Sequence, residues 1–326
     1  MDRIVVLAGG VGGAAFVRGL RRAVAGTGTA ITVICNVGDD MWLTGLRVCP
    51  DLDSMMYALA GVNDRARGWG RAGESERVAG ELSAFGAGVD WFALGDLDLA
   101  TNVARTALLR EGHPLSEVTQ RLCGRWDLGV HLLPVTDDEM ETRVEIATEG
   151  ATRTMHFEEW WVRHRAALPV RRFVSSNAAA ARPAPGVLEA LDDADAVLLA
   201  PSNPVVSIGT LLAVPGMRDA VRAARGRVVG VSPIIGGSVV RGMGDVCLRA
   251  LGVDVEAAGV ARHYGARVRG GLLDAWLVDL VDEAAVEPLG RDGIVSAAVP
   301  LWMRDDEATA AIARHALVLA GRPGRG

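Results

Sequence analysis

Lysine is absent from this chain: all 34 basic residues among its 326 are arginine. The phosphate-binding lysine of a Walker motif and a lysine Schiff base are therefore excluded. Any phosphate would have to be held by backbone N–H groups, by arginine or by a metal ion. No block of like charges stands out, and the formal net charge is −6. Because nucleic-acid-binding proteins carry basic stripes, we expect no nucleic-acid partner.

Several other features are scarce. No run of 18 apolar residues occurs, so we expect no membrane span. The N-terminus leads directly into a strand pattern without a signal peptide, and we expect a cytoplasmic protein. The six histidines show no metal-ligand spacing, and no GxSxG motif is present. The four cysteines lack CxxC spacing, which indicates neither a zinc knuckle nor a disulfide framework: Cys35, Cys49, Cys123 and Cys247.

The first segment predicts a phosphate-binding unit. Ile4–Ala8 has the pattern of a buried strand, and a helical pattern runs from Ala14 to Val24. Between them, a glycine-rich turn would present backbone N–H groups at a helix N-terminus, as in Rossmann-like folds. The candidate nucleotide-binding residues are Gly10, Val11, Gly12 and Gly13. Their spacing is G-x-G-G, and a tight turn without a ligand is the alternative interpretation.

A second candidate site follows the next predicted strand, Ile31–Cys35. Asn36 stands where a dinucleotide-binding protein has a ribose-binding acid, which counts against an NAD enzyme. It is a further nucleotide-binding candidate that could hold a phosphate or a base, or it could simply cap the turn. Two acidic clusters come next, and like charges so close together usually need a cation, a cationic partner or open water. Oxygen-rich clusters at the end of a parallel strand suit Mg²⁺, whereas a solvated loop with Asp51 or Asp53 as a helix cap is the alternative. The four acids are Asp39, Asp40, Asp51 and Asp53.

Further along the chain, apolar runs at 91–94, 194–199 and 228–231 predict three more strands. The first precedes Asp96 and Asp98, which we expect in an acidic loop before a helix from about Asn102 to Arg110. The other two precede turns that contain Ser202, Asn203 and Ser232, which could contact a nucleotide. Loops after four strands would thus converge at one edge of a parallel sheet.

A segment richer in β structure interrupts this pattern. Alternation from Val144 to Phe157 predicts β strands, and a short helix follows over Glu158–Trp161. We therefore predict one α/β domain over 1–326, with a Rossmann-like, mostly parallel sheet covered by helices on both faces. Its core would span about 1–125 and 185–326, and the smaller β-rich insertion about 126–184.

Nine motifs occur in an order that resembles a known family: G-G-V-G-G, N-V-G-D-D, C-P-D-L-D, G-W-G, L-G-D-x-D-L-A-T, L-P-V-T-D-D, H-F-E-E-W-W-V, A-P-S-N-P-V-V-S-I-G and V-S-P-I-I-G-G. Together they resemble the 2-phospho-L-lactate transferases of coenzyme F420 biosynthesis, especially the actinobacterial phosphoenolpyruvate-using branch. The resemblance covers nearly the whole chain.

The resemblance implies a specific reaction. A GDP-activated three-carbon acid, phosphoenolpyruvyl or lactyl, would be attacked by the ribityl hydroxyl of the deazaflavin Fo, with release of GMP. It implies Mg²⁺ and a homodimer, and it assigns Asp39 and Asp53 as metal ligands. By the same resemblance Asp53 and Ala93 contact Fo. To these we add Asp96 and Asp98 as Fo-binding candidates, and Asp40 and Asp51 as acid/base or positioning groups.

The chain departs from the family's pattern at positions that usually carry a basic or titratable residue: Ala15, Thr44, Ala93 and Leu97. Arg18 and Arg47 could replace some of the lost charge. Two alternatives therefore stay open: the same transfer to a different alcohol, or a lapsed GDP-binding regulator.

Overall fold

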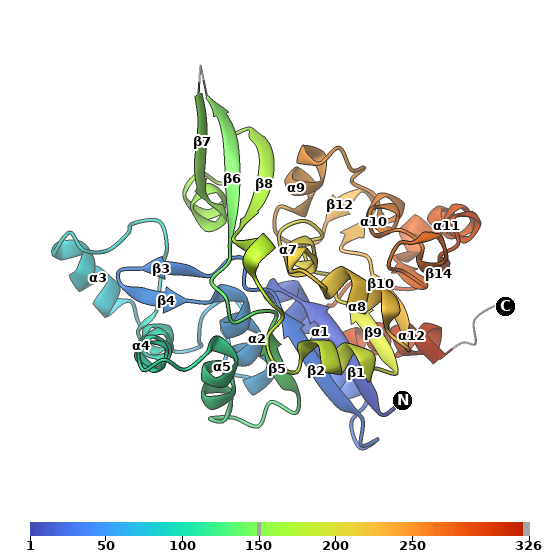
Figure 1. The fold of residues 1–326 in the computed structure, drawn as a ribbon, viewed down its shortest axis with the longest axis horizontal. Helices are drawn as coiled ribbons and strands as arrows, with labels where there is room; N and C mark the ends of the chain where they lie inside the picture. The colour runs from blue at the N-terminus through green and yellow to red at the C-terminus, as the bar shows by residue number, and fades with distance from the viewer. Residues whose placement is uncertain (149–150, 322–326) are drawn as a thin grey trace.

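A computed structural model of the chain describes residues 1–148 and 151–321. Its centre is a parallel sheet of seven strands (Figure 1). From edge to edge these are β14 (Val295–Ala298), β13 (Ala275–Val278), β10 (Arg227–Val231), β9 (Ala196–Leu199), β1 (Arg3–Ala8), β2 (Ala30–Cys35) and β5 (His131–Pro134). The inner strands are apolar and buried along almost their whole length, as expected of a parallel sheet covered on both faces.

In the described ranges, twelve α-helices connect or cover these strands: α1 (Gly10–Ala23), α2 (Pro50–Ala60), α3 (Arg77–Ala84), α4 (Asp96–Arg110), α5 (Leu115–Cys123), α6 (Val187–Asp192), α7 (Ile208–Ala213), α8 (Met217–Ala223), α9 (Gly244–Ala250), α10 (Ala257–Tyr264), α11 (Val286–Asp292) and α12 (Asp306–Gly321). Short helical turns are η1 (Glu159–Arg163), η2 (Ala178–Ala180), η3 (Arg267–Arg269) and η4 (Leu280–Ala285). Among the described residues, no helix is long and apolar enough to span a membrane.

The order of the strands reverses between β1 and β9. From β1 the chain moves to β2 and β5 on one side, and from β9 it moves to β10, β13 and β14 on the other. Right-handed crossovers in opposite directions place helices on opposite faces. Accordingly α1 packs against α2 and α12, whereas α6, α7 and α8 pack together in front of the sheet in Figure 1. Ligands of open α/β sheets bind at such a reversal, beyond the carboxyl ends of the strands.

A three-stranded antiparallel sheet rises from this carboxyl edge (Figure 1). It contains β6 (Glu141–Thr148), β7 (Ala151–His156) and β8 (Val170–Ser176), all of which lie within the segment 126–184 where we expected a β-rich insertion. The predicted β structure from Val144 to Phe157 includes residues 149–150, which lie outside the described residues. Two hairpins complete the fold: β3 (Met41–Leu43) with β4 (Leu46–Val48), and β11 (Ile234–Ile235) with β12 (Ser238–Val239).

Four local predictions were wrong. Residues 91–94 form no strand; Trp91, Phe92 and Leu94 instead pack against the β3–β4 hairpin, because a short apolar run serves a local cluster as well as a sheet. Helix α4 begins at Asp96, so the expected acidic loop is its first turn. Helix α1 includes the glycine-rich turn. Helix α2 begins at Pro50 after Cys49, so neither Asp51 nor Asp53 is its N-cap.

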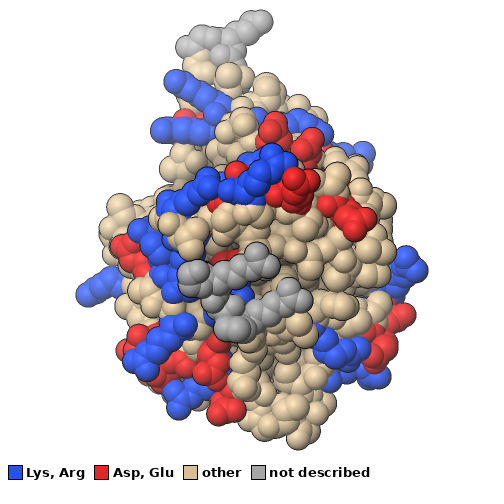
Figure 2. Space-filling view, turned by 90° about the vertical axis from the view of Figure 1, so that its right-hand side faces the viewer, with Lys and Arg blue, Asp and Glu red and all other residues tan. Residues whose placement is uncertain are grey.

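Charge is mixed on the outside of the molecule. On the face drawn in Figure 2, arginine and acidic side chains lie in small neighbouring patches with uncharged surface between them. Oppositely charged side chains also form exposed ion pairs, for example Arg262 Nε with Asp292 Oδ2 at 2.8 Å. Such exposed pairs contribute little stability.

Candidate functional site

The turns that follow β1 and β9 meet at the reversal of the sheet. The Ser202 hydroxyl accepts a hydrogen bond from the Gly9 N–H at 3.0 Å and donates one to the Gly9 carbonyl at 2.7 Å. Gly10, Val11, Gly12 and Gly13 form the first turn of α1, where N–H groups lack partners within the helix. The sequence-predicted turn and loop are therefore in contact, and the turn offers donors suited to an anion.

Asn36 and Asp51 lie directly beneath this turn, and both are buried. The Asn36 amide donates to Asp51 Oδ2 at 2.9 Å, and its oxygen accepts from the Gly38 N–H at 3.0 Å. A Cβ atom on Gly9 would lie 2.5 Å from Asp51 Oδ2, so only glycine fits there. Burial raises the pKa of Asp51 to about 6, although the bonds from Asn36 and Gly10 oppose the rise.

Two more acids lie close to Asp51. Asp39, from the loop after β2, and Glu158, from the insertion, are 4% and 6% exposed. Burial and repulsion by Asp51 and Glu158 hold the pKa of Asp39 well above its usual range. Burial and repulsion by Asp51 raise the pKa of Glu158 to about 8. The mutual repulsion that raises these pKa values indicates that the three carboxyl groups lie near one another, and among the described residues no arginine forms an ion pair with any of them. We call Asp39, Asp51 and Glu158 the unpaired acids.

Two further acids have cationic partners. Asp53 forms an ion pair with Arg105, and both are almost fully enclosed. The space beside this pair has no room for a water molecule. Asp40 Oδ2 lies 3.7 Å from Nη2 of the buried Arg47, and burial raises the pKa of Asp40 to about 7 despite that guanidinium. These pairs tie α2 and the β2 loop to α4 and β4.

The acids at the start of α4 divide into two kinds. Asp98 is buried and accepts a hydrogen bond from the Tyr57 hydroxyl at 2.8 Å; burial and Asp53 raise its pKa to about 7. Asp96 caps the neighbouring α3 region by accepting from Ser75 and from the Val78 N–H, which lowers its pKa. Ala93 lies exposed on the preceding loop. The structure thus brings Asp98 near Asp53 but directs Asp96 elsewhere.

The remaining nucleotide-binding candidates use their side chains locally. The Asn203 oxygen accepts from the Val205 N–H at 2.9 Å, and the Ser232 hydroxyl donates to the Ile234 carbonyl at 2.8 Å. Both shape the loops that follow β9 and β10. Arg18 is bonded to Asp306 of α12 at 2.8 Å, whereas Nη1 of Arg47 has no hydrogen-bond partner in the described ranges.

Glu158 was missed as a site residue, although its motif, H-F-E-E-W-W-V, stood out in the sequence. The signal was one of two adjacent glutamates on a segment rich in aromatic residues. Such a segment buries at least one face, so either acid was a candidate for burial. Sequence spacing alone could not place that acid beside Asp39 and Asp51.

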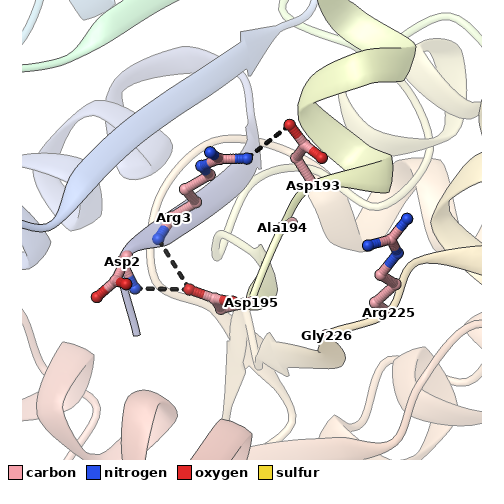
Figure 3. A pocket seen from close by; sticks show the side chains of 7 residues that line it. All are labelled: Asp2, Arg3, Asp193, Ala194, Asp195, Arg225 and Gly226. Atoms are coloured by element: carbon pink, nitrogen blue, oxygen red, sulfur yellow. Dashed lines mark hydrogen bonds and ion pairs between the residues drawn. The ribbon is translucent and has the colours of Figure 1, made fainter.

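A cavity of about 450 Å³ lies at the opposite, amino edge of the sheet (Figure 3). Its charged lining is already paired. Arg3 bonds to Asp193 at 2.6 Å, and Asp195 accepts from the N–H groups of Asp2 and Arg3 at 2.6 and 3.0 Å. We therefore place the functional site at the carboxyl edge, where buried charge is left without a partner.

Comparison with known proteins identifies the family of the chain. Residues 4–296 match the sequence profile of the family described as 2-phospho-L-lactate transferase CofD. The chain is 55% identical over 318 residues to a phosphoenolpyruvate transferase of Streptomyces griseus, which covers 98% of both chains. Proteins of the same name from Thermobifida fusca and Mycolicibacterium smegmatis are 55% and 49% identical over 98% of this chain and 98% and 99% of theirs.

A crystal structure of a UPF0052 family protein from Bacillus halodurans shares the fold. Its TM-score is 0.63 over 97% of this chain and 100% of the other, at 18% identity. That likeness confirms the α/β Rossmann-like architecture. The profile match and the identity to the named relatives go further and confirm the resemblance of the motifs: the chain belongs to the 2-phospho-L-lactate transferase CofD family.

Proposed function

We propose that this transferase moves a phosphoenolpyruvyl or 2-phospho-L-lactyl group from its GDP-activated form to the ribityl hydroxyl of the deazaflavin Fo, with release of GMP. Membership of the family supports the reaction type, and the names of the actinobacterial relatives favour the phosphoenolpyruvyl group. The observation that carries the proposal is the group of unpaired acids beside a glycine-rich turn at the reversal of the sheet.

The nucleotide part of the donor would lie along the turns after β1 and β9. The N–H groups of Val11, Gly12 and Gly13, in the first turn of α1, would donate to a phosphate at the helix N-terminus, where the helix dipole favours negative charge. Ser202 holds this turn in place through its two bonds to Gly9. Asn36 links the turn's support, Asp51, to the β2 loop. Asn203 and Ser232 shape the loops that flank the nucleotide.

Mg²⁺ is the proposed metal, and the side chains present fit it in chemistry. Asp39 Oδ1 is enclosed and has no hydrogen-bond partner within the described residues, and Mg²⁺ prefers such oxygen ligands. No three potential ligands in the described part of the chain form a complete metal site by themselves. Mg²⁺ commonly uses one or two carboxylates together with substrate phosphates. We propose Asp39 as a ligand of this metal; the resemblance also assigns Asp53, but that carboxylate is already paired with Arg105. When bound, Mg²⁺ would neutralise the charge of the diphosphate.

The other predicted residues keep supporting roles. Asp51 positions Asn36 and the glycine-rich turn, and Asp40 holds Arg47 in the buried interior. Asp98 and Ala93 flank the start of α4, on the side where we place Fo. We further propose a cytoplasmic homodimer. The four free cysteines fit a reducing compartment, and light scattering of the purified protein would give its mass in solution.

The test is an assay of purified protein with Fo, Mg²⁺ and freshly prepared enolpyruvyl-diphosphoguanosine. Mass spectrometry should find the phosphoenolpyruvyl adduct of Fo together with GMP in equal amounts. The adduct should be absent when Mg²⁺ is chelated. If GDP binds tightly by calorimetry but no adduct forms, Fo is not the acceptor, and the same assay with other alcohols is the next step.

A further inference from the structure

Glu158 is the one acid of the site that the proposed reaction leaves without a task. It follows β7 and directly precedes η1, so the insertion brings it to the carboxyl edge of the central sheet. The residue is 6% exposed, yet its carboxylate has no hydrogen bond or ion pair with any described residue. Neither oxygen is among the fully enclosed polar atoms. The carboxylate is therefore free to meet a ligand.

A neutral histidine holds Glu158 in place. His156 Nδ1 accepts a hydrogen bond from the Glu158 N–H at 3.1 Å, so that nitrogen carries no proton. The proton then lies on Nε2, which donates to the Asp40 carbonyl at 3.3 Å. Burial lowers the pKa of His156, which favours this neutral form. His156 thus links the backbone of Glu158 to the loop that carries Asp39.

A second contact fixes the insertion to the same loop. The Thr142 N–H at the start of β6 donates to the Gly38 carbonyl at 2.5 Å. A Cβ on Gly38 would lie 2.5 Å from both Thr142 and Thr210, so the loop and the insertion fit only with glycine there. The position of Glu158 relative to Asp39 and Asp51 is therefore set by the fold and not by a flexible arm.

The other acids of the site are already engaged or enclosed. Asp51 accepts from Asn36, and Asp53 is paired with Arg105. Both oxygens of Asp40 and Oδ1 of Asp39 are fully enclosed within the described structure. Among the acids near the glycine-rich turn, Glu158 has the carboxylate best placed to receive a hydroxyl group.

We propose that Glu158 is a catalytic residue that binds the attacking hydroxyl of the acceptor and takes its proton; this role rests on the proposed function. The acceptor oxygen forms a bond to the phosphorus that carries the three-carbon group. The bond from that phosphorus to the bridging oxygen breaks, and its electron pair leaves with GMP. The hydroxyl proton passes to the Glu158 carboxylate, so atoms and charge balance.

The test compares E158Q with E159Q. Glu159 is adjacent on the same turn but is paired with Arg163 at 3.3 Å and Arg153 at 3.7 Å, which makes it a matched control. With Fo, Mg²⁺ and enolpyruvyl-diphosphoguanosine, we expect E158Q to lose about 10²- to 10⁴-fold in kcat, the usual contribution of a general base. The kcat of E159Q should stay within about threefold of wild type, because Glu159 is engaged by two arginines and is not the proposed base, whose loss would cost at least about 10². GDP and Mg²⁺ affinities of E158Q, measured by calorimetry, should be unchanged.

Three results would overturn the role. Turnover by E158Q close to that of E159Q would show that the carboxylate takes no part. A loss of Mg²⁺ affinity in E158Q that matches its loss of rate would make Glu158 a metal ligand instead. No adduct from the wild-type protein would reject the proposed function and this role with it. E158D, which keeps the charge but shortens the side chain, should recover part of the rate if Glu158 is the base.

Discussion

The acidic side chains at the two ends of the central sheet differ in burial and in pairing. At the amino end, Asp193 and Asp195 line an open cavity of about 450 Å³ and are bonded to Arg3 and to backbone N–H groups. At the carboxyl end, Asp39, Asp51 and Glu158 are buried, and no arginine in the described part of the chain is paired with them. Burying charge without a partner costs free energy, so such groups persist where function needs them. Buried acids without a cationic partner, and not cavity volume, therefore mark the site.

The largest difference in activity should appear when one acid at each end of the sheet is neutralised in turn. Asp39→Asn removes a proposed Mg²⁺ ligand, and metal-assisted stabilisation of a transition state is worth several kcal/mol. We expect a loss of at least about 10²-fold in kcat/KM for adduct formation. Asp193→Asn at the amino end should keep wild-type activity. Equal losses in the two variants would remove the functional distinction between the two ends.

Ion pairs at the two ends should contribute differently to the free energy of unfolding. Arg105→Ala leaves the buried Asp53 without its cation, and breaking a buried pair in this way costs about 3–5 kcal/mol. Arg3→Ala breaks an exposed pair, which costs at most about 1 kcal/mol. Urea unfolding followed by circular dichroism gives both free energies of unfolding. A cost below about 1 kcal/mol for Arg105→Ala would mean that Asp53 is not dependent on its partner.

The two ends should also respond differently to pH. Burial raises the pKa of Asp98 to about 7 and that of Asp51 to about 6, above the unfolded values near 4. Between about pH 4 and these values the folded state binds more protons than the unfolded state, so stability falls as pH rises. The slope is on the order of 1 kcal/mol per pH unit for each such group.

Thermal unfolding of the ligand-free protein from pH 5.5 to 8 measures this slope. The melting temperature should fall toward pH 8, and Asp98→Asn should flatten the fall because it removes one raised pKa while keeping an acceptor for Tyr57. A melting temperature that rises with pH across this range would show that these carboxyls are ionised in the folded protein.

Much of the frame of the site was predictable from the sequence. The loops after β1, β2, β9 and β10 converge as expected, because buried apolar runs followed by glycine or proline are typical of parallel strands. Strands β13 and β14 were not predicted; they are four residues long, and β14 has the weakly apolar sequence Val295–Ala298. The false strand at 91–94 was equally short. Periodicity cannot separate such runs from loops.

The contacts between distant segments were beyond prediction. Asp53 and Arg105 are joined by the packing of α4 against the β4 hairpin, and Glu158 reaches Asp39 through the insertion. No local pattern encodes either distance. The sequence predicted four acids near Asn36 but not which of them find an arginine, and that difference separates structural acids from candidate functional ones.

The smallest effect on the melting temperature should come from replacing Asp195, whose pKa is lowered by the N–H groups of Asp2 and Arg3. A lowered pKa gives stability that is complete above the unfolded value near 4 and is lost only as pH falls below it. Asp195→Asn should therefore lower the melting temperature slightly and by the same amount at pH 5.5 and pH 8, with activity unchanged. Because Asp98→Asn should change the pH slope and Asp195→Asn should not, parallel thermal scans of the two variants separate the ends of the sheet within one experiment. If the melting temperature of Asp195→Asn varied with pH as little as that of Asp98→Asn, the pH response would come from general surface charge and not from the buried acids.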